Sequence, residues 1–183
     1  WAMNVPEARG GPGLSYATVA KVFSIVSAAD ASLGQIAQNH ISLIDLIRFD
    51  PSEERQRAFY AMALRGLRFG NALSERGGKH VRDLQTRLTR KGDGFVINGT
   101  KFYATGAIYA HVVPVGALDE DGKGVMAFVP RDTPGLTIVD DWSGIGQRTT
   151  GSGTVDLVDV PVSPDQILPT HLGYDIPSVH GAV

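Results

Sequence analysis

The chain has 183 residues, of which 43% are hydrophobic and 20% are charged, and its formal net charge is −2. This size and composition are typical of a globular protein with one domain or slightly more, and the charge gives no electrostatic reason to expect nucleic acid or an anionic membrane as a partner. The lack of cysteine excludes disulfides and thiolate chemistry.

No apolar run approaches the roughly 20 residues that span a bilayer, and no basic segment followed by an apolar one marks export. We therefore expect a cytoplasmic protein. The chain starts at Trp1 and stops at Val183 after a loop-like stretch, and we expect both ends to be cut.

The first third of the chain is predicted to be helical. Ser15 precedes apolar residues at the spacing of a half-buried helix, namely Val19, Val22, Phe23 and Val26. Asp30 can cap a second helix, whose expected inward stripe comprises Leu33, Ile36, Ile44 and Ile47. His40 lies on that same stripe. Ser52 can cap a third helix that begins with acidic residues and is expected to end near Gly66.

After Gly66 the pattern changes to strands. Gly92-Asp93-Gly94 separates Thr86–Lys91 from Phe95–Asn98, which predicts a hairpin. A second hairpin is predicted from two further apolar runs, Val112–Ala117 and Val125–Val129, and two more strands are predicted at Leu136–Val139 and Thr154–Val160. Glycine punctuation at this spacing favours an antiparallel sandwich or barrel over alternating strand–helix–strand units.

The predicted fold class is therefore α+β, with a helical domain followed by an antiparallel β domain. We expect the helical domain over residues 1–67 and the β domain over residues 68–162. Prolines interrupt residues 163–183, which show no periodicity and are expected to be a linker.

Three short stretches place small or hydroxyl residues beside aromatic or apolar ones at the edges of predicted strands. They are Asn71–Glu75, Gly99–Gly106 and Trp142–Gly153. This combination suits a flat, apolar ring with a rim of nitrogen and oxygen atoms, such as a flavin, because the faces need apolar cover and the rim needs hydrogen-bonding groups. No cluster of His, Asp or Glu has metal-ligand spacing, so no metal site is predicted.

The same stretches resemble a known family. Val5–Gly11 resembles a Pro-Glu-x-x-Gly-Gly loop, and Ala72–Glu75 resembles an Ala-Leu-Thr-Glu stretch. Asn98–Thr105 resembles Asn-Gly-x-Lys-x-Trp-Ile-Thr, and Gly146–Thr149 followed by Val158–Pro161 resembles a closing Gly-x-Arg and Asp-Val-x-Val-Pro signature. In this order and spacing, the motifs resemble the acyl-CoA dehydrogenase superfamily, and within it the branch of dibenzothiophene monooxygenase and related sulfur-assimilation flavin monooxygenases.

The resemblance implies a fold and a set of cofactor contacts. The family has an N-terminal helical domain, a central β domain and a C-terminal four-helix bundle, and this chain would lack the bundle, with residues 163–183 leading toward it. Carried over by position, the flavin would contact Asn71, Leu73, Ser74, Tyr103 and Thr105. The hydroxyls of Ser74 and Thr105 would bond the ring edge around N5, and Tyr103 would cover a ring face.

The positions at which this chain differs from the family's dehydrogenases imply which reaction the protein catalyses. The family's dehydrogenases carry a Gly-Ser-Asp element that helps to hold acyl-CoA, where this chain has Gly78-Lys79-His80, and the family's Trp is Tyr103 here. His40 resembles a histidine of the monooxygenase branch's active-site pocket. The leading hypothesis is a two-component monooxygenase that uses reduced FMN from a separate flavin reductase, oxygen and a small sulfur-containing substrate. His40 and Thr105 would be catalytic, and the full-length form would be a homotetramer.

Other interpretations remain open. The chain could come from an FAD-dependent acyl-CoA dehydrogenase, or be a catalytically incomplete flavin-binding fragment. His40 could be a hydrogen-bonded core histidine, and Ser74 and Thr105 could be hydroxyls that satisfy backbone groups at strand ends. Arg148 is expected to clamp the β domain, and Trp142 is expected to pack in the core.

Overall fold

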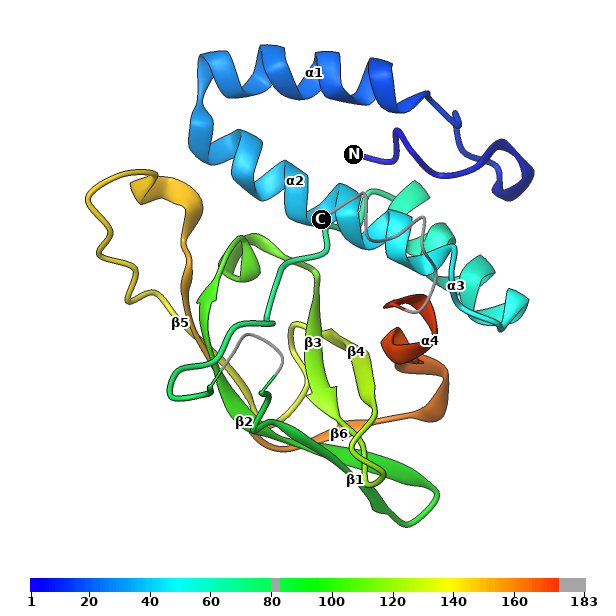
Figure 1. Ribbon diagram of the computed structural model, residues 1–183, viewed down its shortest axis with the longest axis vertical. Helices are drawn as coiled ribbons and strands as arrows, with labels where there is room; N and C mark the ends of the chain where they lie inside the picture. The colour runs from blue at the N-terminus through cyan, green and yellow to red at the C-terminus, as the bar shows by residue number, and fades with distance from the viewer. Residues whose placement is uncertain (80–82, 175–183) are drawn as a thin grey trace.

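The computed structural model describes residues 1–79 and 83–174. Its N-terminal part contains a short 3-10 helix, η1 (Glu7–Arg9), followed by three α-helices: α1 (Tyr16–Ala29), α2 (Ala31–Ile47) and α3 (Glu53–Leu64). Figure 1 shows α1 and α2 as an antiparallel pair above the sheet, with α3 beside them. Among the described helices, none has the length and apolar content needed to cross a membrane.

The sequence predicts each of these helices through its cap. The side chain of Ser15 accepts a hydrogen bond from the Thr18 backbone N–H at 3.2 Å, and Asp30 accepts from Ser32 N–H at 2.7 Å. Ser52 accepts from the third residue of α3 in the same way. These side chains satisfy donors that the first helical turn leaves free, so the three helix starts are confirmed.

The expected inward stripe of α2 is confirmed at Ile44 and Ile47, whereas Ile36 is only partly buried. His40, Ile44 and Ile47 are at most 1% exposed, but Leu33 is 46% exposed. Leu33 lies in the first turn of α2, where it lines a cavity together with residues of α1 and of the N-terminal segment. The expectation that Leu33 points inward is therefore wrong, because the helix extends beyond the surface that buries the rest of its stripe.

The β part is a seven-stranded sheet in the order β5-β6-β2-β1-β3-β4-β7. The first four strands are β1 (Arg87–Lys91), β2 (Gly94–Ala104), β3 (Val112–Leu118) and β4 (Gly124–Pro130). They are followed by β5 (Leu136–Val139), β6 (Gly153–Val162) and β7 (Ile167–Leu168). Both predicted hairpins are present, β1 with β2 and β3 with β4.

The α+β class is confirmed, although the sheet is mixed where we expected it to be antiparallel. β1 meets β3 in parallel through Arg87 and Leu118, and Phe69 and Ala72 form parallel bridges to β3. The parallel contact joins the two hairpins, and hairpin signals in a sequence do not specify how hairpins are joined. The bridges of Phe69 and Ala72 place residues 69–72 alongside β3.

The helices and the sheet share a core across β4. Alternate residues of β4 point to opposite faces. Ala127 and Val129 join the cluster inside the β part, whereas Met126 and Phe128 join the cluster that contains Ile44 of α2 and other helix residues. The ring of Phe128 stacks on Phe59 of α3 at 4.2 Å. This packing attaches the helices to the outer face of the sheet.

Residues after Val162 contribute regular structure that the sequence did not predict. β7 pairs with β4, and α4 (Thr170–Tyr174) follows it. Leu168 is 1% exposed and lies in the helix-facing cluster, so its burial stabilises β7. The strand was not predicted because two residues are too few to show a periodic pattern. The rest of the expected linker, residues 175–183, lies outside the described residues, and the division into domains at 67 and 162 stays a prediction.

Candidate functional site

Residues 71–75 lie between β3 and β2. The backbone N–H of Ala72 donates to Pro114 of β3 at 3.1 Å, and the Ser74 carbonyl accepts from the Phe102 N–H of β2 at 2.9 Å. Two of the stretches that stand out in the sequence are therefore adjacent. The hydroxyl of Ser74 is half-buried and makes no hydrogen bond within the described part of the chain. Leu73 packs against the cluster between helices and sheet.

A buried ion pair holds these two stretches together. Lys101 Nζ lies 2.6 Å from Glu75 Oε1, and the side chains are 0% and 8% exposed. The same oxygen accepts from the Thr86 hydroxyl at 2.6 Å, and Lys101 also donates to the Leu73 carbonyl at 3.2 Å. The network thus joins residues 71–75, the segment before β1 and β2 at one point.

The protonation states in this network follow from its hydrogen bonds. Burial alone would raise the pKa of Glu75, but the hydrogen bonds from Lys101 and Thr86 outweigh it and lower the pKa to about 2. Burial lowers the pKa of Lys101, and Glu75 opposes that shift. The sequence motifs assigned no role to Glu75 or Lys101, although both residues belong to motifs that carry the resemblance.

Tyr103 lies where β2 turns away from its regular path. Its φ is 56°, in the left-handed region, and its ring is 52% exposed. Trp142 lies edge-on to that ring at 6.2 Å, and the Arg76 guanidinium lies 5.3 Å from its centroid. A left-handed tyrosine costs backbone energy, and such strained residues gather at binding sites.

Thr105 belongs to a buried chain of hydroxyl groups. Its Oγ1 lies 2.8 Å from Ser152 Oγ, which lies 2.8 Å from Thr150 Oγ1. Thr150 Oγ1 then donates to the Gln147 carbonyl at 2.9 Å. The main partner of Thr105 is therefore another side chain, and the Tyr103 carbonyl lies at 3.5 Å, the limit of a hydrogen bond. Ser152 belongs to the stretch 142–153 that stands out in the sequence, but no role was predicted for it.

The stretch 142–153 lies beside the stretch 99–106, but two expectations about it are wrong. Trp142 is half-buried and lies outside both core clusters; its indole N–H donates to the Gln147 carbonyl at 3.0 Å, which holds its ring beside Tyr103. Arg148 was expected to clamp the β domain, yet it is exposed and forms no ion pair or side-chain hydrogen bond within residues 1–79 and 83–174. A segment that contains Gln147 in a left-handed conformation turns Arg148 outward.

His40 is buried at the seam between α2 and the β part. It is 1% exposed, and its Nδ1 accepts from the Phe69 backbone N–H at 3.0 Å. The proton of the neutral ring is therefore on Nε2, which lies near the Trp1 backbone but makes no hydrogen bond of normal geometry among the described residues. Burial and, after it, the positive charge of the amino terminus at Trp1 lower the pKa of His40 to about 4, and the Trp1 backbone opposes this shift, so the ring is neutral at pH 7.

Asn71 lies at the same seam. Its Nδ2 donates to the Asn39 side chain at 3.1 Å, while its Oδ1 is buried without a partner in the described structure. Asn39 precedes His40 in α2, and Asn71 is two residues from Phe69. The seam therefore presents the Nε2–H of His40, with only the Trp1 backbone near it, and the Oδ1 of Asn71, which has no partner among the described residues. Buried polar atoms without good partners are rare in native proteins.

The predicted residues form two groups linked by residues 71–75. One group is at the helix seam, with His40 and Asn71, and the other is at the end of β2, with Tyr103 and Thr105. Ser74 connects them, because its carbonyl bonds β2 at Phe102. The free polar atoms of the first group and the exposed ring of the second fit a planar group whose rim carries nitrogen and oxygen atoms.

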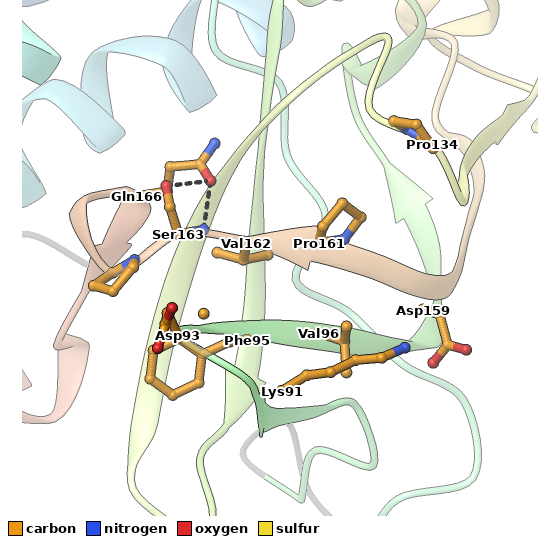
Figure 2. A pocket seen from close by; sticks show the side chains of 12 residues that line it. Lys91, Asp93, Phe95, Val96, Pro134, Asp159, Pro161, Val162, Ser163 and Gln166 are labelled. Carbon is orange, nitrogen blue, oxygen red and sulfur yellow. Dashed lines mark hydrogen bonds between the residues drawn. The ribbon is translucent and has the colours of Figure 1, made fainter.

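Two cavities lie outside these groups. An open groove of about 730 Å³ lies at the other end of β2, against Phe95 and Pro161; in Figure 2, Gln166 and Ser163 are hydrogen-bonded to each other at its edge. The sequence placed no site residue there. A smaller cavity of about 250 Å³ lies between α1 and α2 and is lined by apolar side chains, including Phe23 and Ile41. Trp1 also lines it, and the Trp1 ring lies edge-on to His40 at 5.6 Å.

Comparison with known proteins gives matches along the chain. Residues 70–160 match the family model described as acyl-CoA dehydrogenase, middle domain. Dibenzothiophene monooxygenase of Rhodococcus erythropolis is 36% identical over 174 residues, which cover 91% of this chain and 42% of that protein. The human mitochondrial short-chain specific acyl-CoA dehydrogenase is 36% identical over 177 residues, with the same two coverages of 91% and 42%.

A solved structure agrees. FMN-bound TdsC from Paenibacillus sp. A11-2 superimposes with a TM-score of 0.83 at 33% identity, over 91% of this chain and 43% of that one. The chain thus spans less than half of the length of the curated relatives that it matches. Its motifs, its fold and these similarities have one explanation: residues 70–160 form an acyl-CoA dehydrogenase middle domain, and the chain belongs to the acyl-CoA dehydrogenase superfamily.

Proposed function

We propose that the whole protein is a two-component flavin monooxygenase that acts on a small apolar, sulfur-containing substrate with reduced FMN and oxygen. The observation that carries the proposal is His40, a buried neutral histidine whose Nε2–H lies at the seam near the Trp1 backbone but makes no hydrogen bond of normal geometry there. A donor held without a partner in an apolar surrounding is costly to stability unless a bound group uses it.

The assignment of a flavin cofactor rests on how well the residues of the stretches 71–75 and 99–106 suit the ring. Asn71, Leu73, Ser74, Tyr103 and Thr105 would hold the ring, with Tyr103 over a face and the hydroxyls at the rim. A flavin bound there supplies the electrons that activate oxygen. The FMN bound in the TdsC structure supports FMN as the cofactor. FAD is the alternative if the whole protein is an acyl-CoA dehydrogenase, to which the chain is equally similar.

Each protein group then has a defined task. His40 keeps its proton on Nε2 because Phe69 occupies Nδ1, so it can donate a hydrogen bond to an oxygen atom of the bound reactants and stay neutral while doing so. Asn71 Oδ1 can accept from a reactant N–H or O–H. The apolar rings that lie against His40, those of Trp1 and Phe69, would keep water away from this hydrogen bond.

The substrate test uses the full-length protein. Reduced FMN, oxygen and dibenzothiophene are mixed, and the sulfoxide is measured by chromatography. We expect product from the wild type and a loss of at least tenfold in product per FMN consumed in His40→Phe, since a well-placed hydrogen bond to a reacting group contributes about that much or more. An unchanged yield in His40→Phe would assign this histidine to the core.

The second candidate is an FAD-dependent acyl-CoA dehydrogenase, which the similarity to the human enzyme favours. It is distinguished by mixing oxidised, full-length protein with a panel of acyl-CoAs without oxygen. Rapid bleaching of flavin absorbance at stoichiometric acyl-CoA would identify a dehydrogenase and refute the monooxygenase. The reductase partner, the homotetramer and the cytoplasmic location stay predictions for the full-length form.

A third possibility concerns the chain of residues 1–183 by itself. Because it spans 42% of its relatives' length, it would hold the described part of the flavin site and lack the remainder. This predicts measurable but weak FMN binding without turnover by residues 1–183. Turnover by this chain alone would contradict the interpretation as an incomplete fragment.

A further inference from the structure

The hydroxyl chain behind Thr105 has a direction. Each of Thr105, Ser152 and Thr150 has one hydroxyl proton to donate. The Gln147 carbonyl can only accept, so the proton of Thr150 is directed to it at 2.9 Å. Thr150 Oγ1 must then accept from Ser152 at 2.8 Å.

The same reasoning reaches Thr105. Because the proton of Ser152 is directed to Thr150, Ser152 Oγ can only accept in its 2.8 Å contact with Thr105. This is the one arrangement in which all three short contacts contain a proton. The proton of Thr105 is therefore committed, and its oxygen faces any further ligand as an acceptor.

The surroundings keep this direction in place. Thr150, Ser152 and Thr105 are 1%, 7% and 7% exposed, so little solvent is available to reverse the chain. The Gln147 carbonyl at its end also accepts from the Trp142 indole at 3.0 Å and from the Thr150 backbone N–H. With several donors directed at it, this carbonyl fixes one end of the chain.

The geometry points to a specificity-determining role for Ser152 and Thr150: they make Thr105 an acceptor that favours the reduced flavin over the oxidised one. The inference rests on the proposed flavin site. An oxidised flavin ring carries one N–H, at N3, whereas reduction adds an N–H at N5, where the oxidised ring has only a lone pair. An acceptor at the ring's rim attracts the N5–H of the reduced flavin. The same acceptor repels the lone pair that the oxidised flavin has at N5.

This changes the role first assigned to Thr105. The resemblance implied hydroxyls that bond the ring edge around N5, and such groups are usually donors to an oxidised ring. Here Thr105 could donate its hydroxyl proton to the flavin only if its hydrogen bond to Ser152 were broken. Ser152 and Thr150 would act through Thr105, as positioning residues that need not touch the flavin.

The test compares dissociation constants for oxidised FMN and for reduced FMN, the latter without oxygen, in the full-length protein and its variants. The wild type is expected to bind reduced FMN more tightly. Ser152→Ala frees the proton of Thr105, and Thr150→Val allows the chain to reverse. Both should lower the preference for reduced FMN by about threefold to tenfold, the range for one net hydrogen bond. Thr105→Val should lower it as well.

Ser143→Ala is the matched control, because Ser143 lies in the same stretch, is exposed and makes no side-chain hydrogen bond within the described residues. It should leave the preference unchanged. A purely structural role for Ser152 would weaken both redox forms equally, so an unchanged ratio in Ser152→Ala and Thr150→Val would overturn the inference. Equal affinities in the wild type would overturn it too while leaving a flavin site, and no binding of either form would overturn the proposed function as well.

Discussion

Lys101 Nζ and Glu75 Oε1 lie 2.6 Å apart, and the side chains of both residues are almost entirely removed from solvent. Glu75 also accepts from Thr86, and the Lys101 ammonium also donates to the Leu73 carbonyl. Three segments distant in the chain therefore meet at one carboxylate. This relationship positions residues 71–75 beside the end of β2, where the candidate site lies.

Removing one partner of this pair should destabilise the protein strongly. Glu75→Gln or Lys101→Met leaves the other charge buried and uncompensated, which typically costs about 3–5 kcal/mol. The double variant Glu75→Gln/Lys101→Met should recover part of that loss. Urea unfolding measures the free energies, and a control pair is Lys123→Met with Asp121→Asn, whose salt bridge is exposed. Equal, small effects at both pairs would contradict the assigned role of the buried pair.

His40 predicts a pH dependence of stability. Its folded pKa of about 4 lies below the ordinary value of 6.5, so the unfolded chain binds the proton first as pH falls. The contribution of neutral His40 is complete above pH 6.5 and is lost progressively as pH falls toward 4. We expect the free energy of unfolding of the wild type to decline between pH 6.5 and 5, and His40→Gln to show less decline. Carboxylates such as Glu75, with a pKa of about 2, affect stability at lower pH. Parallel curves for the two proteins would refute the prediction.

Gly99 should not tolerate a side chain. Its φ is +155°, and an added Cβ would lie 2.3 Å from Thr86 Oγ1 and 2.9 Å from Thr86 Cα. Gly99→Ala must displace Thr86 and its hydrogen bond to Glu75, at a cost of about 1–3 kcal/mol. Gly146→Ala is the control, because an added Cβ there meets no atom within 4 Å. Thermal unfolding compares the two, and equal melting temperatures would show that Thr86 moves without cost.

Phe128 should be needed to hold the helices on the sheet. It is 1% exposed and its ring lies 4.2 Å from Phe59 and 5.4 Å from Phe69, measured between centroids. Phe128→Ala should lower the free energy of unfolding by about 3–5 kcal/mol through lost burial and an unfilled cavity. Val158→Ala, at a residue that is 67% exposed, should change it little. Hydrogen exchange should also increase in α3 of Phe128→Ala, and unchanged protection there would contradict this account of the docking.

Local signals in the sequence determined most of the secondary structure. Ser15, Asp30 and Ser52 mark helix starts because a cap acts within one turn. Gly92 and its neighbours mark a hairpin because a tight turn needs residues that adopt unusual backbone angles. Each family motif consists of residues that are neighbours in the chain, so it can be recognised without the fold. These motifs also indicated Tyr103 and Thr105 as candidate site residues.

Only the tertiary structure decided how those elements meet. β7 is a strand because β4 and the helices bury Leu168, and Leu33 is exposed because α2 extends beyond its neighbours. Glu75 and Lys101 are 26 residues apart in the chain, and Thr105 and Ser152 are 47 apart. Periodicity and caps describe interactions within a few residues, whereas a buried ion pair and a directed hydroxyl chain require side chains that only folding brings together.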